Sequence, residues 1–387
     1  MLNQKNLRRS DYTLLGQWRW TIDGTLLTVL ILMAIMGIVL SFTASPPVAK
    51  RIGYGEFYFV YRQIIFGSMA IIVMILLSFL NLKWIRRLSL LVFIFGVLIL
   101  ALLPIIGHSN NGATRWIILP VIHLSIQPSE FVKPALIIMV ATVLSEKYRS
   151  KGFPGFSLAF LLVVVTITSL VIQPDIGMSA LIIVATIVQF YVAGIATWIF
   201  FALIPVAAIG IWWIFITQDH VRTRVLQFIE STLGGDTSSL PYQVAVSLRS
   251  LRNGGIVGLG PGAGTAKLHL PDAHTDYIFA VIGEEFGLIF CLIIIMLVAF
   301  VVIRSLHRAA QQNNQFVMIA TAGLSSLFAF QALVNLSSTL SIIPPKGMTL
   351  PFISYGGSST LALAVLAGIL LSLTRERPWD TEDIYNE

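Results

Sequence analysis

Residues 270–277 read LPDAHTDY and join a polar, glycine-rich loop to an apolar segment that continues to Ile303. Asp276 is the charged residue at the start of this segment. Because a carboxylate is costly to hold at the edge of hydrocarbon, a residue of this kind tends to mark a functional site. The alternative is a helix N-cap, in which Asp accepts a hydrogen bond from a free backbone N–H at the positive end of a helix. The surrounding sequence has to decide between these two interpretations.

The composition is that of a membrane protein. Of 387 residues, 56% are hydrophobic and 11% are charged, against about 25% charged in an ordinary soluble domain. The net charge of +7 comes from basic residues scattered among loops, without the stripe and interleaved aromatic residues that nucleic-acid binding requires. Cys291 is the only cysteine, which excludes a disulfide and a thiolate metal site. The sequence therefore indicates a polytopic membrane protein that does not bind nucleic acid.

Ten apolar segments are long enough to cross a membrane. They cover residues 24–43, 59–80, 87–106, 129–146, 157–173, 176–195, 197–217, 276–303, 315–338 and 352–374. Basic residues gather in alternate connections, which the positive-inside rule places in the cytoplasm. These residues are Lys5, Arg8, Arg9, Arg19, Lys83, Arg86, Arg87, Lys147, Arg149, Lys151, Arg304, Arg308, Arg375 and Arg377. The expected fold is an all-α polytopic membrane protein of about ten transmembrane helices with both termini cytoplasmic.

The chain reads as one integral membrane domain over residues 1–387, with cytoplasmic tails at 1–23 and 375–387. The polar N-terminal stretch leads into an apolar segment that is too long for a signal-peptide core, so we interpret it as an uncleaved span. Residues 218–275 form a large extracytoplasmic loop, which is too long to lack structure or function.

Two parts of this loop, at 221–228 and 244–252, have the spacing of short interfacial helices. The glycine-rich run at 254–264 lies outside a βαβ unit, so it predicts tightly turning backbone rather than a phosphate cradle.

Three spans begin with charged residues on the same predicted side of the membrane. They open at Glu130 with Lys133, at Asp175 and at Asp276. Glu130 and Lys133 are three residues apart, so they share a helix face and can form an ion pair. Independent N-caps explain Asp175 well but Lys133 poorly, because a cation near a helix N-terminus opposes the helix dipole. We therefore expect a shared polar cavity at the outer leaflet.

Further candidates leave alternatives open. Arg115 and Trp116 could present a phosphate-binding fork beside an interfacial ring, or could be a snorkelling Arg beside an aromatic-belt Trp. Glu284 and Glu285 could include a proton-relay acid, or could be satisfied by neighbouring helices. Residues 341–359 are rich in proline and glycine, so this irregular backbone must be buried in protein or line a cavity.

Together these motifs resemble the SEDS family (shape, elongation, division and sporulation), membrane glycosyltransferases that polymerise peptidoglycan. The resemblance covers essentially all the spans and is carried by Arg115-Trp116, QPSE at 127–130 with Lys133, QPDIG at 173–177, HTD at 274–276 with Glu284-Glu285, and residues 351–359. Residues 271–276 and 346–355 resemble the division branch (FtsW-like) more than the elongation branch (RodA-like). The departures are Asp272 in place of an expected Glu and Pro345 where the division branch often has Thr.

The resemblance implies that Lipid II is joined to a nascent glycan strand by a β-1,4 link, with release of undecaprenyl pyrophosphate and inversion at the anomeric carbon. Asp276 would be the general base that takes the proton of the acceptor 4-hydroxyl. The substrate-binding residues would be Lys133, Glu130, Arg115, Trp116, Asp175, His274, Ser354 and Tyr355, with Lys133 and Arg115 at the pyrophosphate. A divalent cation, Mg or Mn, could assist the leaving group, although the sequence shows no metal-ligand spacing.

The resemblance also implies a location and partners. The protein would lie in the bacterial inner membrane at the division septum, with a class B penicillin-binding transpeptidase and other divisome proteins around it. Three alternatives differ in class or branch: an elongation-type polymerase, a Lipid II flippase, and a scaffold whose spans bind partner proteins. A flippase should spread its charges along a path through the bilayer, whereas most charges here are expected at the outer rim.

Overall fold

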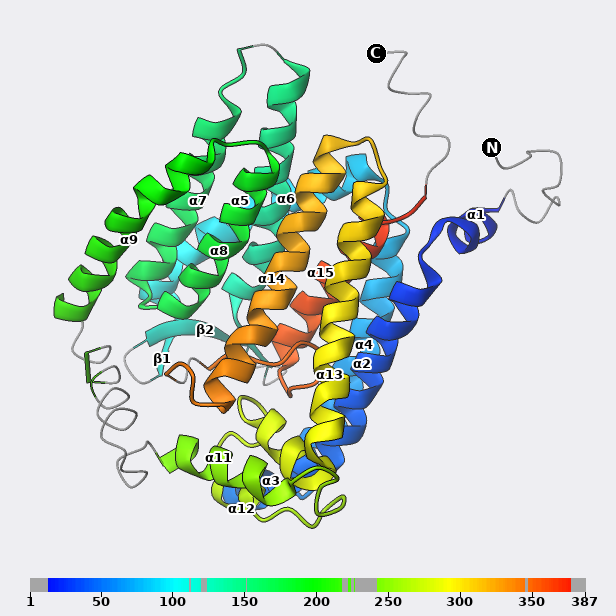
Figure 1. Ribbon diagram of the computed structural model, residues 1–387, viewed down its shortest axis with the longest axis vertical. Coiled ribbons are helices and arrows are strands. Elements are labelled where there is room, and N and C mark those ends of the chain that lie inside the picture. Colours follow the sequence, from blue (N-terminus) through cyan, green and yellow to red (C-terminus); the bar gives the residue numbers. More distant parts are fainter. Residues whose placement is uncertain are drawn as a thin grey trace.

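The computed structural model describes residues 13–110, 113–119, 124–150, 152–217, 222–223, 226, 242–344 and 347–376. Its helices form a bundle along the longest axis of the molecule (Figure 1). The helices α3 (Pro46–Ile52), α11 (Tyr242–Gly254) and α12 (Ala266–His269) lie at the lower end in Figure 1, called the site end below, and a small sheet lies above them in this view. The helix α1 (Leu14–Thr21) lies at the opposite end, called the terminal end.

Each of the ten predicted spans contains a long apolar helix. They are α2 (Gly24–Ala44), α4 (Tyr58–Ser78), α5 (Leu82–Ile106), α6 (Pro128–Arg149), α7 (Gly155–Ile172), α8 (Ile176–Val192), α9 (Thr197–Thr217), α13 (Ile278–Ala310), α14 (Gln315–Thr339) and α15 (Gly357–Leu373). Among the described residues, seven of these are long and apolar enough to cross a membrane, namely α2, α4, α5, α6, α7, α13 and α14. The protein is a multi-pass membrane protein, and the exact number of spans and their orientation stay predictions.

Side-chain caps explain where several helices begin. Asp23 accepts hydrogen bonds from the backbone N–H groups of Thr25 and Leu26 at the start of α2, both at 3.1 Å. Asn314 accepts a bond of 3.1 Å from the N–H of Phe316 at the start of α14. Such caps satisfy donors that a helix leaves unpaired in its first turn. Polar residues between apolar runs therefore set the helix boundaries.

The last helix begins at Gly357, inside the apolar segment 352–374 and near the end of the irregular stretch 341–359 that the sequence predicts. The N–H groups of Ile353 and Ser354 both donate to the carbonyl of Leu350, and Phe352 has a φ of 61°. A left-handed backbone at Phe352 interrupts a helix, although the residues around it are buried and apolar. Tertiary packing, not composition, therefore decides this boundary.

A small sheet between α5 and α6 is an addition to the predicted all-helical fold. The strands β1 (His108–Asn110), β2 (Ala113–Leu119) and β3 (Leu124–Ile126) pair antiparallel in the order β1-β2-β3. β2 reads ATRWIIL, and its β-branched and aromatic residues suit a strand. The sheet's strand β2 carries Arg115 and Trp116.

Burial differs sharply among the long helices. In the most apolar 18-residue stretch of α6 and of α14, 78% and 67% of the residues are buried. The corresponding shares are 22% in α5 and 28% in α13. Most residues of α15 are also buried, so α6, α14 and α15 form the centre of the bundle and the more exposed helices surround them. The polar residues on these central helices are held away from solvent and must find partners inside the protein.

The large loop folds back onto α13. This helix is interrupted at Gly287, where φ is 76° and ψ is −176°. The N–H groups of Leu259 and Gly260 donate to the carbonyls of Glu284 and Glu285, both at 2.9 Å. The glycines at 255, 258, 260 and 262 all have positive φ, which confirms the predicted tightly turning backbone. Glycine is needed at Gly258, because a Cβ atom there would collide with the backbone of Glu285.

Of the two short helices predicted in this loop, the one at 244–252 is α11. The predicted helix at 221–228 lies mostly outside the described residues. α11 packs against α13, and its Ser250 hydroxyl donates to the carbonyl of Ala280 at 2.8 Å. The loop therefore supports the segment that opens α13.

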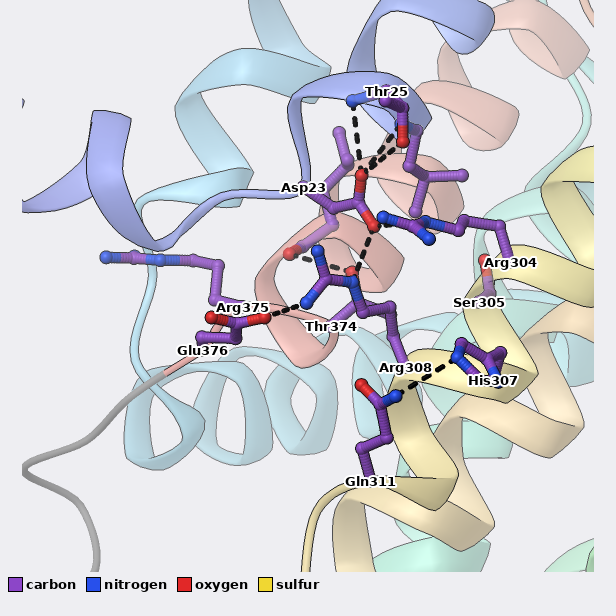
Figure 2. Close-up of polar contacts among 12 residues, drawn as sticks. Asp23, Thr25, Arg304, Ser305, His307, Arg308, Gln311, Thr374, Arg375 and Glu376 are labelled. Carbon is purple, nitrogen blue, oxygen red and sulfur yellow. Dashed lines mark hydrogen bonds and ion pairs between the residues drawn. The ribbon is translucent and has the colours of Figure 1, made fainter. Parts of the chain in front are cut away.

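Four charged residues hold the terminal end together (Figure 2). Asp23, at the start of α2, pairs with Arg304 and Arg308 of α13 at N···O distances of 2.7 and 2.8 Å. Arg308 also pairs with Glu376, just after α15. Burial alone would raise the pKa of the Asp23 carboxyl, but hydrogen bonds from Thr25, Arg304, the Leu26 backbone and Arg308 together hold it well below its usual value. These contacts fix α2, α13 and the end of α15 to one another.

Candidate active site

Residues 270–277 form a compact turn that is tied to the rest of the protein at both ends. The N–H groups of Thr275 and Tyr277 donate to the carbonyl of Asp272, both at 3.2 Å. The Nη2 atom of Arg51 in α3 donates to the carbonyls of Leu270 and Pro271, at 3.1 and 2.8 Å. Arg51 is more than two hundred residues away in the chain, so this anchor depends on the tertiary fold.

The side chain of Asp276 does not cap α13. The N-cap residue of this helix is Tyr277, and no side-chain hydrogen bond caps the helix. Among the described residues, no hydrogen bond or ion pair engages the Asp276 carboxylate. Partial burial and the negative charge of Asp272 raise the pKa of Asp276 to about 7. The arrangement favours the functional interpretation of Asp276 over the cap.

His274 lies in a group of aromatic rings. Its ring centroid is 4.6 Å from that of Phe59 and 5.2 Å from that of Tyr355. Its backbone carbonyl accepts a bond of 2.9 Å from the N–H of Tyr355. Burial, with a smaller effect of Arg51, lowers the pKa of His274 to about 4, so the ring is neutral at pH 7. In the part of the chain that the structure describes, the buried Nδ1 atom has no hydrogen-bond partner.

Ser354 and Tyr355 follow the turn before α15. The Ser354 hydroxyl accepts a bond of 2.8 Å from the N–H of Leu350 and is buried, so it stabilises this turn. Burial raises the pKa of the half-buried Tyr355 hydroxyl to about 12. Of these two predicted substrate-binding residues, Ser354 is used within the turn, and the ring of Tyr355 lies beside that of His274.

Glu130 and Lys133 form the ion pair that their spacing predicts. The Nζ atom of Lys133 lies 2.8 Å from a carboxylate oxygen of Glu130, 3.4 Å from Oε1 of Gln331 and 3.5 Å from the sulfur of Met178. The side chain of Lys133 is only 2% exposed. A charged pair at this depth is stable only because both partners are satisfied. The arrangement holds Lys133 inside the protein and does not present its ammonium group to an open groove.

Asp175 and Arg115 form a second polar group. Asp175 caps α8 through the N–H of Met178 at 3.4 Å and lies 3.6 Å from Nη1 of Arg115. Arg115 also donates to the carbonyls of Gln173 and Pro174. Burial raises the pKa of Asp175, and the charge of Arg115 acts in the opposite direction. With 31% of its side chain exposed, Arg115 is the more accessible of the two predicted phosphate-binding cations.

The predicted residues therefore gather at the site end without forming one continuous group. Among the described residues, α14 connects Lys133 to Asp276, because Gln331 contacts Lys133 and Asn335 contacts the Asp276 backbone. A void of about 10 Å³ beside Glu130, Lys133 and Gln331 has room for about one water molecule, and its lining does not include Asp276. The half-buried Trp116 lies on β2, one residue after Arg115.

Glu284 and Glu285 bind the large loop, not neighbouring spans. The Glu284 carboxylate accepts bonds from the N–H of Ala266 at 2.9 Å and the hydroxyl of Thr265 at 3.3 Å. The Glu285 carboxylate accepts a bond of 3.0 Å from the N–H of Gly262 and pairs with Lys267. Both side chains are at most 1% exposed and fully engaged. This arrangement favours a structural role over a proton relay.

The sequence interpretation missed Arg51, Phe59, Gln331 and Asn335. A signal existed for the last two, because polar amides four residues apart in an apolar span share a helix face and need partners there. Arg51 and Phe59 gave no such signal, since their contacts with residues 270–274 depend on the tertiary fold.

The chain is similar to known proteins over most of its length. A family model described as cell cycle protein FTSW_RODA_SPOVE matches residues 24–378. A probable peptidoglycan glycosyltransferase FtsW from Caulobacter vibrioides is 43% identical over 372 residues, which is 96% of this chain and 93% of that protein. The protein of the same name from Haemophilus influenzae is 32% identical over 362 residues, covering 92% and 90% of the two chains.

Solved structures share the fold. A chain of a peptidoglycan synthase complex that coordinates polymerization and crosslinking superposes with a TM-score of 0.74 at 24% identity, covering 95% of this chain and 99% of that chain. The rod shape determining protein RodA of Thermus thermophilus gives 0.65 at 24% identity, with 91% and 96% covered. At this identity the likeness shows the fold alone.

Proposed function

The chain belongs to the FTSW_RODA_SPOVE family of cell cycle proteins, and from this membership we propose that it is a peptidoglycan glycosyltransferase of the FtsW type. It polymerises Lipid II into β-1,4-linked glycan strands at the outer leaflet and releases undecaprenyl pyrophosphate. The division branch is favoured over the elongation branch because the two relatives with 43% and 32% identity are FtsW proteins, whereas the RodA structure is 24% identical.

The observation that carries the proposal is the state of Asp276. Its carboxylate is partly buried, caps no helix, and has a pKa of about 7. A general base works best when its pKa lies near the operating pH, because it is then both ionised and basic enough to accept a proton. An ordinary surface aspartate, with a pKa near 4, would be a much weaker base.

The reaction is one displacement at the anomeric carbon of the donor. The 4-hydroxyl of the acceptor sugar attacks this carbon, and its proton passes to the Asp276 carboxylate. The new C–O bond forms as the bond to the pyrophosphate oxygen breaks, and the bonding electrons leave with the pyrophosphate. Attack from the face opposite to the leaving group turns an α-linked donor into a β-linked product.

Different residues serve the leaving group and the sugars. Arg115 is the proposed pyrophosphate ligand, because its guanidinium is partly exposed and has the fork geometry that phosphate favours. Trp116, His274 and Tyr355 offer rings and polar edges for the sugars. Glu130, Lys133 and Asp175 are proposed to support the site through their contacts with other residues, without touching the substrate. Ser354 fixes the turn that carries Tyr355.

A divalent cation, Mg or Mn, would be bound by the pyrophosphate of the substrate and would assist its departure. Among the described residues, no three His, Cys, Asp or Glu side chains lie close enough to hold a metal ion. The protein's donors alone therefore do not fit a resident metal site, and no step is assigned to one.

The membrane and partner assignments are also proposals. The site end faces outward from the bacterial inner membrane and Arg304 and Arg308 lie on the cytoplasmic side, as the positive-inside rule favours. Residues 1–387 form one membrane domain that works at the septum with a class B penicillin-binding transpeptidase and other divisome proteins.

The test is polymerisation of purified Lipid II by the purified chain, with and without its transpeptidase, in parallel with Asp276→Asn. We expect muramidase-sensitive glycan from the parent and none from D276N. Lipid II flipping in vesicles is measured on the same samples. Flipping without glycan synthesis by the parent, in both the absence and presence of the transpeptidase, would refute the polymerase and favour a flippase.

A further inference from the structure

Two buried amides lie on one face of α14. Gln331 and Asn335 are four residues apart, and their exposed fractions are 2% and 1%. Residues four apart stand one above the other on a helix. A buried amide lowers stability unless its hydrogen bonds are satisfied, so the partners of these two side chains show what they hold together.

Asn335 connects two loops that are distant in the sequence. Its Nδ2 atom donates to the backbone carbonyl of Asp276 at 2.9 Å and to that of Met348 at 2.7 Å. Both hydrogens of the amide are therefore used, one on each loop. This side chain fixes the carbonyl of Asp276 with respect to the segment before α15.

That segment lies beside the Asp276 carboxylate. Gly347 has a φ of 66°, and a Cβ atom at this position would lie 3.5 Å from Oδ2 of Asp276. The distance between the backbones at 276 and 348 thus sets how much space surrounds the carboxylate. Asn335 fixes that distance, because it donates hydrogen bonds to the backbone carbonyls of both residues.

Gln331 connects the same segment to Lys133. Its Nε2 atom donates to the carbonyl and the hydroxyl of Thr349, both at 3.2 Å, and its Oε1 atom accepts from Lys133 at 3.4 Å. The Thr349 hydroxyl also lies 2.7 Å from that of Ser359 in α15. Two adjacent turns of α14 thus contact Lys133 on one side and the Asp276 backbone on the other.

We infer that Asn335 is a positioning residue for the general base, and that Gln331 secures the same segment to the Glu130–Lys133 pair. The inference rests on the proposed function. Asn335 does not contact the substrate. It acts by holding the Asp276 backbone against residues 347–349, so that the carboxylate meets the acceptor hydroxyl in one geometry. A misplacement of about 1 Å in a reacting group can reduce a rate about 100-fold.

The test is Asn335→Ala in the full chain with its transpeptidase. The matched control is Ser325→Ala, which removes a buried hydroxyl of the same helix that has no partner among the described residues. We expect N335A to lower kcat about 10- to 100-fold, with KM for Lipid II within about twofold of the parent. Ser325→Ala should leave both constants near those of the parent.

The pH dependence of kcat separates positioning from a loss of folded protein, because the apparent pKa does not depend on the active fraction. In N335A, water should reach Asp276 more freely, so the acidic limb of kcat should shift to lower pH. Asp272 and Tyr277 are the titratable neighbours of Asp276, while Arg51 of α3 acts on His274 and Arg62 of α4 acts on Tyr355. Lys133 of α6 contacts Gln331, which lies one turn before Asn335 on α14. None of these groups is altered in N335A.

If N335A does not fold, Asn335→Ser takes its place, since the serine hydroxyl can still donate to one carbonyl. We then expect a smaller loss of kcat and a smaller shift of the acidic limb. A folded variant with the parent's kcat and pH profile would overturn the inference while the polymerase proposal stands. A parent that makes no glycan would refute both proposals.

Discussion

The Nζ atom of Lys267 lies 2.5 Å from Oε1 of Glu285, and both side chains are buried. This pair joins the large loop to α13, seven residues into the helix that follows Asp276. Among the described residues, it is one of four contacts that the Glu284 and Glu285 carboxylates make with the loop. The conformation of the loop before Asp276 therefore depends on the buried ion pair between Lys267 and Glu285.

Lys267→Met should destabilise the protein, because it leaves the Glu285 carboxylate buried without its cation. Removing one partner of a buried ion pair typically costs about 3–5 kcal/mol. Thermal unfolding of the purified variant in detergent measures this change. Glu56→Gln is the matched control, since the Lys50–Glu56 pair is 2.7 Å long but more than half exposed, and such pairs contribute about 0–1 kcal/mol. Equal unfolding temperatures for the two variants would contradict the structural role.

Arg51→Met should slow glycan synthesis, because it removes both hydrogen bonds to the carbonyls of Leu270 and Pro271. Bonds from a charged donor contribute about 1.5–3 kcal/mol each, so a rate about tenfold lower is a conservative expectation. Arg51→Lys keeps the charge and one flexible donor and should recover part of the loss. Initial rates of polymerisation for the two variants decide this. If both matched the parent, Arg51 would not be an anchor of the site.

Asp276→Asn should stabilise the protein at neutral and alkaline pH. Burial raises the pKa of Asp276 from 3.8 to about 7, so the ionised carboxylate destabilises the folded state above about pH 4, and this cost is fully present above about pH 7. The asparagine carries no charge and avoids the cost. The difference in unfolding temperature between D276N and the parent should therefore grow as the pH rises from 5 to 8. A difference that stayed constant over this range would mean that Asp276 has an ordinary pKa.

Much of the fold could be predicted from the sequence, because long apolar runs bounded by polar residues specify helices in a membrane. The irregular backbone before the last helix was predicted from its prolines and glycines, but the positive φ of Phe352 was not, since it depends on packing that composition does not reveal. The sheet that carries Arg115 was missed because its strands are short and lie in a loop.

The site was predictable only in part. The Glu130–Lys133 pair follows from helical spacing, and the structure confirms it. The link between Lys133 and Asp276 was not predictable, because it runs through Gln331 and Asn335, which come from a third helix. The burial of Lys133 was also missed, since a sequence does not show which face of α6 points into the bundle.

The most direct measurement is the initial rate of glycan synthesis from Lipid II between pH 5.5 and 8.5, for the parent and for Asp276→Asn. A base with a pKa of about 7 loses its proton-accepting form as the pH falls through 7, so the parent's rate should drop about tenfold for each pH unit below about 6.5. D276N should make no glycan at any pH in this range. A flat profile for the parent, or glycan synthesis by D276N at a rate near the parent's, would contradict the assignment of Asp276 as the base.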